Sequence, residues 1–304
     1  MLSEKKACFL VVLTAIISGF SVFLNKFGVA ETDAIAFTAL KNTLVAVFLI
    51  SIILLAKDFP SLKSLSKKQW AKLAAIGLIG GSIPFALFFS ALKLTSAVNA
   101  GFFHKTLFIF AAAFAILFLK EKISKTFLIA AGLLLLGNFL LFPFSGFGLP
   151  ELLVVTAVIF WAAENVLSKH VLKELNGNTV AFGRMFFGSL ILLLFIAVSG
   201  RFGILTAVNP VQFQWILLTS IPLLLFVLTF YNGLKHIPVS KATAILMLGQ
   251  PITMLLSAVF IGSAVSFSQA TGIALTLIAI LLLFASSYFL AFLRSKGFSL
   301  AATK

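Results

Sequence analysis

The sequence is poor in charged residues and in cysteine. Only 10% of its 304 residues are charged, whereas 61% are hydrophobic. This composition excludes an ordinary soluble domain and is typical of a membrane protein. The single cysteine, Cys8, excludes an intrachain disulfide. The chain has no P-loop, GxSxG or HExxH motif, and its three histidines lack metal-ligand spacing. We therefore expect no enzyme activity, cofactor, metal site or built-in ATP hydrolysis.

Acidic residues are also scarce, with eight Asp and Glu against 23 Lys and Arg, a net charge of +15. If the N-terminus is placed in the cytoplasm, seventeen of the basic residues fall on that side. Only Lys26, Lys93 and Arg201 fall on the other side. This asymmetry follows the positive-inside rule and predicts cytoplasmic termini in a cell (inner or plasma) membrane. The charge therefore reports topology, and a nucleic-acid partner is not expected.

Apolar runs are long and the connections between them are short. A bilayer core about 30 Å thick is crossed by about 20 helical residues. The predicted spans are 8–25, 35–56, 71–94, 97–119, 125–142, 150–169, 179–198, 213–234, 241–261 and 268–290. We interpret residues 1–25 as a retained span and not as a signal peptide, because the run is long and no clear cleavage site follows it. The function must then lie between the helices.

The second half of the chain repeats the first. A shift of 143 positions places Asn25-Lys26 on Ser168-Lys169 and Lys41 on Arg184. We divide the chain into residues 1–145 and 146–292, each with five spans, and a cytoplasmic tail of residues 293–304. Because five is odd, the second repeat enters the bilayer the other way up, as in many secondary transporters. The predicted fold is all-α, with ten transmembrane helices in two inverted repeats.

Four charged residues lie well inside the predicted spans: Lys41, Lys105, Glu164 and Arg184. A charge at the bilayer centre costs about 2.5–3.5 kcal/mol on insertion scales, so these residues indicate a polar interior. Trp161, Glu164, Asn165 and Ser168 share one helical face, which indicates either a wet cavity or polar contacts between packed helices. Glu164 lies in the inner half of its span, where Arg184 is the expected partner. Lys41 and Arg184 either face the pathway near opposite mouths or extend to the headgroups.

Two groups of residues are candidates for transport. The predicted substrate-binding residues are Lys41, Asn99, His104, Lys105, Trp161, Glu164, Asn165, Arg184, Tyr231 and Gln250. The predicted hinges are Pro84, Pro222 and Pro251, since proline removes a backbone donor and bends a helix. Simple helix curvature is the alternative for the prolines, and contact with a neighbouring helix is the alternative for His104.

Several motifs resemble those of the drug/metabolite transporter superfamily, in particular its EamA-type members. They are Ile159-Phe160-Trp161 through Asn165, Ser168-Lys169, Phe182-Gly183-Arg184, Gly233-Leu234-Lys235 into Pro238, Gly249-Gln250-Pro251, and Lys120-Glu121-Lys122. The resemblance implies a ten-helix basket, a central cavity and alternating access, with many members acting as exporters. The chain departs from the pattern at Gln250, where glutamate is common, and at Gly262-Ser263, which lacks the counterpart of Glu121.

We therefore predict a secondary transporter, acting as an exporter, for an amino acid or a related carboxylate. Lys105, with Lys41 or Arg184, would hold the anionic end, Trp161 the apolar part, and Glu164 an amine or a coupling proton. A carrier of organic phosphates or nucleotide sugars is the alternative, and it requires the three basic side chains to converge. A non-transporting scaffold or sensor requires a closed interior without a cavity of a few hundred Å³. The oligomeric state is left open, a homodimer included.

Overall fold

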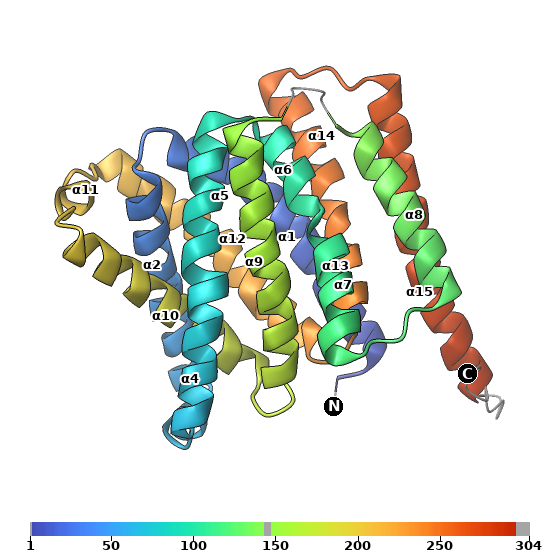
Figure 1. Ribbon diagram of the computed structural model, residues 1–304, viewed down its shortest axis with the longest axis horizontal. Coiled ribbons are helices and arrows are strands. Elements are labelled where there is room, and N and C mark those ends of the chain that lie inside the picture. Colours follow the sequence, from blue (N-terminus) through green and yellow to red (C-terminus); the bar gives the residue numbers. More distant parts are fainter. Residues whose placement is uncertain (1, 143–146, 296–304) are drawn as a thin grey trace.

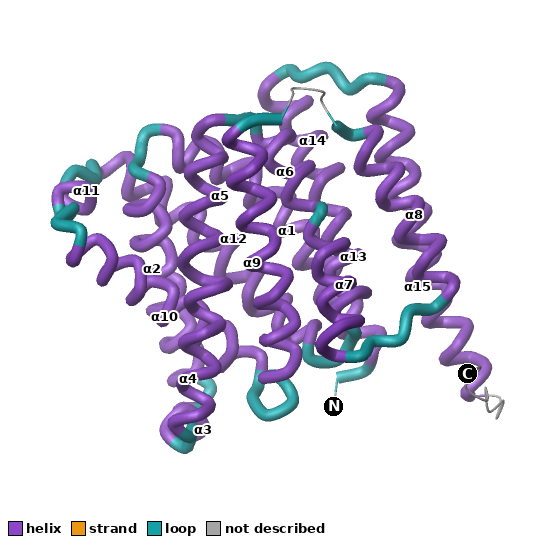
Figure 2. Tube along the Cα trace, viewed as in Figure 1, coloured by secondary structure: helices purple, strands orange, loops and turns teal. Residues whose placement is uncertain are grey.

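The computed structural model describes residues 2–142 and 147–295, with side chains described through residue 285. The predicted boundary between the repeats and most of the predicted tail lie outside these ranges. The described chain is helical throughout (Figures 1 and 2). The first half contains α1 (Glu4–Ala30), α2 (Ala34–Leu55), α3 (Phe59–Lys63), α4 (Lys67–Ile76), a π-helical turn (Gly77–Ser82), α5 (Ile83–Leu94), α6 (Ala97–Lys105), α7 (Leu107–Leu119) and α8 (Lys125–Leu140). The second contains α9 (Leu149–Val171), α10 (Gly177–Val198), α11 (Gly203–Thr206), α12 (Pro210–Leu234), α13 (Val239–Ile245), a 3₁₀ turn (Leu246–Leu248), α14 (Gly249–Ile261) and α15 (Phe267–Ser295).

The described residues form nine helical stretches long and apolar enough to cross a membrane. Consecutive helices combine in three of them, as Lys67–Leu94, Ala97–Leu119 and Val239–Ile261. The fifth predicted span corresponds to α8, an apolar helix of 16 residues that is shorter than these nine. At 1.5 Å per residue α8 is about 24 Å long, less than the hydrocarbon core. It packs against α15, and each helix presents a glycine, Gly137 or Gly272, at the contact.

The two halves run in opposite directions through the molecule. In Figure 1, α1 begins at the lower end of the molecule, whereas α9 begins at the upper end. From these starting points, successive spans of each half alternate in direction between the two ends of the molecule. Helices of one half pack on helices of the other, α1 on α12 and α2 on α10 among them. The interior is therefore built from both repeats.

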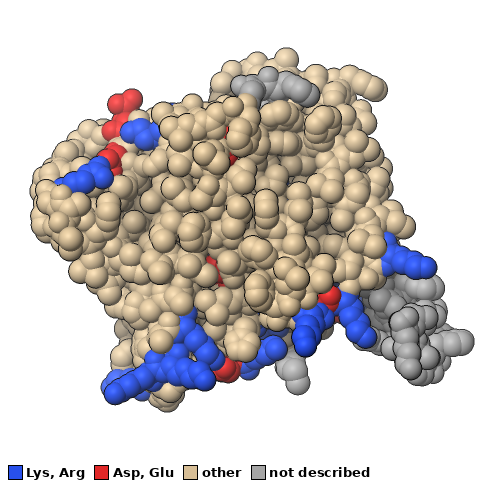
Figure 3. Space-filling view, in the orientation of Figure 1, with Lys and Arg blue, Asp and Glu red and all other residues tan. Residues whose placement is uncertain are grey.

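Basic side chains gather at the lower end of the molecule, which we call the basic end (Figure 3). At this end α1 begins and α7 ends (Figure 1). The opposite end shows few charges, and one of its ion pairs joins Arg201 Nη2 to Asp33 Oδ2 at 3.1 Å. This distribution supports the proposal that the basic end faces the cytoplasm.

Local sequence sets where many of the helices begin and end. Ser96 and Ser124 cap α6 and α8 by accepting hydrogen bonds from backbone N–H groups in the first turn. The ends of α5 and α12 are capped by repeat mates. Lys26 Nζ donates to the carbonyls of residues 92, 93 and 95, and Lys169 Nζ donates to those of residues 234, 235 and 237. Ammonium groups satisfy the unpaired carbonyls of a helix C-terminus.

Three spans that the hydropathy pattern predicts as continuous are interrupted. The π-helical turn Gly77–Ser82 divides the third span. The fourth span breaks at Thr106, between α6 and α7, and the fourth span of the second half breaks at the 3₁₀ turn Leu246–Leu248. With an offset of 142, these last two breaks coincide in the repeat. Discontinuous helices of this kind place irregular backbone beside a transport site.

Candidate functional site

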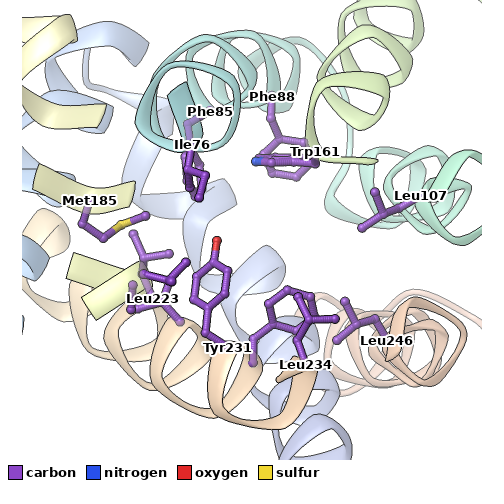
Figure 4. Close-up of a cluster of buried hydrophobic side chains, with 14 of the residues drawn as sticks. Ile76, Phe85, Phe88, Leu107, Trp161, Met185, Leu223, Tyr231, Leu234 and Leu246 are labelled. Carbon is purple, nitrogen blue, oxygen red and sulfur yellow. The ribbon is translucent and has the colours of Figure 1, made fainter. Parts of the chain in front are cut away.

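A narrow cavity of about 70 Å³ lies between the two halves. Figure 4 shows side chains of α5 and α9 on one side and side chains of α12 on the other, with the Tyr231 hydroxyl directed into the space between them. The lining residues are Ser18, Ser21, Val22, Asn25, Phe85, Phe88, Phe89, His104, Lys105, Leu107, Trp161, Glu164, Asn165, Arg184, Leu223, Phe226, Phe230, Thr243 and Leu246. The open space has room for a few water molecules and is smaller than a typical ligand pocket.

A single backbone carbonyl, that of Gly80, organises one wall of the cavity. In a regular helix this oxygen would accept from the N–H of residue 84, but Pro84 has none. The oxygen instead accepts two side-chain donors from the second half, Trp161 Nε1 at 3.0 Å and Arg184 Nη2 at 3.0 Å. A Cβ atom at residue 80 would run into Glu164 and approach Arg184. The sequence Gly-Gly-Ser-Ile-Pro thus creates both the acceptor and the space for its donors.

Glu164 is fully buried and lies at the centre of a polar network. Its Oε1 accepts from the hydroxyl of Ser168, one turn further along α9, and from the hydroxyl of Tyr231 at 2.6 Å. Its Oε2 lies 3.7 Å from Arg184 Nη1 and has no hydrogen-bond partner among the described residues. The expected pairing of Glu164 with Arg184 is present. Tyr231 also accepts from Arg184 Nη1 at 2.9 Å and so bridges the two charges.

Lys105 reaches the cavity from the break in the fourth span. It is the last residue of α6 and is 3% exposed. Its Nζ donates to Ser18 Oγ at 3.0 Å, and this is its one hydrogen bond in the described part of the chain. A Cβ at Gly249 would lie 2.7 Å from the ammonium, so the glycine provides the space that Lys105 occupies. An ammonium has three donors, and two of them remain for a ligand.

Lys41 is the repeat mate of Arg184, but the structure places it outside the cavity lining. Its Nζ donates to Asn25 Oδ1 and lies 5.3 Å and 5.2 Å from the ring centres of Phe37 and Phe89. Arg184 stacks in the same way on Tyr231, which is the repeat mate of Phe89. Both basic side chains are buried, at 1% and 4% exposure. Neither side chain therefore extends to the surface of the protein, and a place of either residue on the transport pathway stays a prediction.

The other predicted residues divide into two groups. His104, Trp161 and Asn165 line the cavity with Lys105, Glu164 and Arg184. Asn99, Tyr231 and Gln250 are not among the lining residues; Tyr231 bonds to Arg184 and Glu164, which are. Asn99 Nδ2 donates to Glu151 Oε1 at 2.5 Å, and Gln250 Nε2 donates to the Val98 carbonyl at 2.9 Å. These contacts hold the start of α6 against α9 and α14, so the two residues position the helix that carries Lys105.

Sequence reasoning missed the apolar part of the lining. It did not identify Phe85, Phe88 and Phe89 of α5 or Phe226 and Phe230 of α12 as individual site residues. With 36 phenylalanines in the chain, residue type alone does not separate these from the lipid-facing rings. The usable signal was the repeat, because residues 88–89 and 230–231 align in the two halves. The rings of Phe85 and Phe88 lie 5.3 Å and 5.5 Å from the Trp161 ring.

The predicted hinge prolines lie in different settings. Pro84 follows the π-helical turn, and Pro251 follows the 3₁₀ turn. Pro222 lies inside the continuous helix α12, where Ser220 Oγ donates to the Ile216 carbonyl at 2.7 Å. Hinge motion at these positions stays a prediction. Local irregularity accompanies the first two prolines, as expected where a backbone hydrogen bond is missing.

Comparisons with known proteins account for both halves of the chain. Residues 5–142 and 148–285 each match the model of the EamA-like transporter family. An uncharacterized transporter of Clostridium kluyveri is 23% identical over 269 residues, covering 81% of this chain and 84% of that protein. An uncharacterized transporter of Archaeoglobus fulgidus is 26% identical over 218 residues, covering 69% and 72%. One solved structure, described as a crystal structure of a protein, shares the fold with a TM-score of 0.75 at 20% identity, covering 95% of this chain and 99% of that one.

Proposed function

This chain belongs to the EamA-like transporter family, and from that premise we propose that it exports a small organic carboxylate, such as an amino acid, by alternating access. Family membership makes it a multi-pass membrane transporter and excludes the scaffold alternative. We further propose that both termini are cytoplasmic and that the basic end faces the cytoplasm. The positive-inside distribution in Figure 3 supports this orientation.

The observation that carries the proposal is the placement of Lys105. Its ammonium is buried beside the cavity at a break in a helix, with Ser18 as its one hydrogen-bond partner among the described residues. A buried ammonium with unused donors is unfavourable unless an anion completes it. A substrate carboxylate would accept its free donors. Arg184 is already engaged by Tyr231, Gly80 and Glu164.

The remaining walls fit an apolar body and a cationic group. Trp161, Phe85 and Phe88 supply aromatic faces to the cavity. Within the described part of the chain no group donates a hydrogen bond to Glu164 Oε2, so this oxygen offers an acceptor to a substrate amine or to a proton. An ammonium, an aromatic wall and a carboxylate in one cavity match the three parts of a zwitterionic amino acid. The cavity is narrow in this conformation, so the substrate enters only when the halves move apart.

The geometry favours a carboxylate over an organic phosphate. A phosphate carrier requires Lys41, Lys105 and Arg184 to converge. Only Lys105 and Arg184 line the cavity, and Glu164 already opposes the charge of Arg184. The residual charge at the site is therefore close to that of one lysine, which suits one carboxylate better than a phosphate dianion.

Flux measurements on reconstituted vesicles test this proposal. Vesicles that contain the purified protein are loaded with labelled amino acids. Efflux and uptake are then compared for wild type, Lys105→Met, Glu164→Gln and Lys125→Met. Lys125 is an exposed lysine at the start of α8, so its variant makes the same charge change outside the cavity. We expect Lys105→Met to lower amino-acid flux at least about tenfold, and Lys125→Met to leave it unchanged.

The variants also separate the alternatives. Glu164→Gln should remove the pH dependence of flux, since glutamine cannot exchange a proton. Wild-type flux in Lys105→Met would contradict the role given to this ammonium. Efficient exchange of organic phosphates without amino-acid flux would replace the proposed substrate class.

A further inference from the structure

The two ends of the molecule repeat each other in backbone detail. Lys93 Nζ donates to the Thr32 carbonyl, and its mate Lys235 donates to the Leu175 carbonyl, both at 2.9 Å. The turn after α7 and the turn after α14 both begin with a residue in the left-handed region, Lys120 at φ 54° and Gly262 at φ 74°. The following N–H groups reach back to equivalent carbonyls in the two turns. The backbone of one turn thus repeats that of the other at an offset of 142.

At the basic end, the turn after α7 contacts the second half of the molecule through Glu121. Its Oε1 accepts from Val239 N at 2.7 Å, and its Oε2 accepts from Ser240 N at 3.2 Å and Ser240 Oγ at 2.7 Å. These are the first two N–H groups of α13, which have no partner within the helix. A carboxylate at a helix N-terminus is favoured by both hydrogen bonding and the helix dipole. The contact joins residues 118 and 119 positions apart in sequence.

At the opposite end, the equivalent contact is missing although the backbone is in place. Ser263 stands where Glu121 stands in the first repeat, and it is exposed. The N–H groups that it would face belong to Ala97 and Val98, which begin α6. A pocket of about 350 Å³ separates them, lined by Ser263, Ala97 and Val98 among others. The side chain that joins turn and helix at one end is thus absent at the other, and its space is open.

Residues that follow the start of α13, and residues of its repeat mate α6, line the central cavity. Thr243 and Leu246 follow the start of α13 by one and two turns, and His104 and Lys105 stand in the corresponding part of α6. Holding the start of α13 against the α7–α8 turn therefore fixes the cavity wall nearest the basic end. The start of α6 has no such hold from the α14–α15 turn. The two ends of the molecule therefore differ by this one contact, although Asn99 and Gln250 hold the start of α6 against α9 and α14.

We propose that Glu121 is a latch that holds the basic end closed, and that its absence at Ser263 biases the transporter toward opening at the opposite end. This inference rests on the alternating-access part of the proposed function and not on the substrate. The latch adds hydrogen bonds to a charged group in only one of the two conformations, which is what shifts a two-state equilibrium. Removing the carboxylate at residue 121, or adding one at residue 263, should therefore change the proportions of the two conformations, open at the basic end and open at the opposite end.

Site-specific labelling tests the latch without any substrate. Cys8 is the only cysteine in the chain, so Cys8→Ala gives a cysteine-free background. Reporters are introduced by Val22→Cys and Asn165→Cys, repeat mates that both line the cavity. In Figure 1, α1 starts at the basic end and α9 starts at the opposite end. Val22 comes late in α1 and Asn165 late in α9, so Val22 is the reporter nearer the opposite end and Asn165 the one nearer the basic end. The modification rate by a small polar maleimide is measured for each reporter in detergent.

The latch predicts opposite changes at the two reporters. Glu121→Ala should raise the rate at the Asn165→Cys reporter at least about threefold and lower that at Val22→Cys. Ser263→Glu should do the reverse, because the added carboxylate can reach the first N–H groups of α6. Glu121→Gln, which keeps an acceptor but no charge, should lie between Glu121→Ala and the parent protein.

Two outcomes would overturn the latch. One is an unchanged rate at both reporters in both variants. The other is a rise at both reporters, which would mean general loosening of the fold, and a thermal unfolding scan of each variant identifies that case. Ser263→Glu adds a contact and removes none, so the proposal stays testable even if Glu121→Ala folds poorly. Loss of the proposed substrate would leave all of these rates unaffected.

Discussion

Removal of one hydroxyl by Tyr231→Phe tests the buried network most directly. The Tyr231 hydroxyl accepts from Arg184 at 2.9 Å and donates to Glu164 at 2.6 Å. Its loss removes two hydrogen bonds to charged groups without removing the ring. The phenyl ring itself is compatible with the backbone, because the repeat mate Phe89 occupies the equivalent position beside Lys41. The variant therefore isolates the hydroxyl.

The magnitude follows from what remains around the two charges. A hydrogen bond to a charged group contributes about 1.5–3 kcal/mol. Glu164 Oε1 keeps the Ser168 hydroxyl, and Arg184 keeps the Gly80 carbonyl and the facing Oε2 at 3.7 Å. Neither charge is left alone, so the loss is below the sum of two bonds, about 2–3 kcal/mol. For a chain of this size, that lowers the unfolding midpoint by about 3–5 °C.

The assay is thermal unfolding in detergent, combined with a double-mutant cycle. Tyr231→Phe, Glu164→Gln and the double variant are compared with wild type. Because the residues share a hydrogen bond, the effects should be non-additive by at least about 1 kcal/mol. The reasoning is refuted if Tyr231→Phe unfolds at the wild-type temperature, or if the two substitutions add without coupling.

Three further predictions concern the scaffold. Lys26→Met and Lys169→Met should each destabilise the protein by about 1–2 kcal/mol, since each ammonium caps the carbonyls at a helix end. If the losses of unfolding free energy in the two variants differ by more than about twofold, the repeat mates are not equivalent. Gly272→Val should lower the unfolding midpoint, because a Cβ there would lie 2.6 Å from a backbone oxygen of α8, and overpacking costs about 1–3 kcal/mol. The hydrogen bond from Lys72 lowers the pKa of Glu174 below its ordinary 4.5. This pair therefore stabilises the fold above about pH 4.5 and loses its effect as the pH falls through the lowered pKa. Lys72→Met should remove this loss of stability at acid pH in a pH series of unfolding scans.

Much of the fold follows from the sequence because hydropathy and repetition are properties of the whole chain. The positions of the spans follow from apolar length, and the opposite direction of the halves follows from an odd number of spans. The pairing of Glu164 with Arg184 followed from depth, since both lie in the same half of their spans. These inferences need no knowledge of which helix faces touch.

Details that depend on tertiary contacts were not predictable. The break between α6 and α7 occurs at Thr106 without proline or glycine there, so no local signal marks it. Lys41 was a candidate for the substrate site, but its ammonium contacts Asn25 and Phe89, which line the cavity, and Lys41 itself does not line it. The contact of Glu121 with α13 joins distant parts of the chain. The sequence showed a departure at Ser263, and only the structure shows which contact is lost.

The repeat separates the parts of the molecule that must be alike from those that must differ. Contacts shared by both halves, such as the capping of helix ends by Lys26 and Lys169, lie at the ends of helices. Several positions that differ between the halves lie around the cavity. Glu164 lines it opposite its mate Ser21, and Lys105 lines it although its mate Met247 does not. A scaffold that exchanges two conformations needs equivalent supports at both ends, whereas an asymmetric substrate needs unlike groups around it. The differences between repeats therefore support the proposed site and, at Ser263, the proposed preference for opening at the end opposite the basic end.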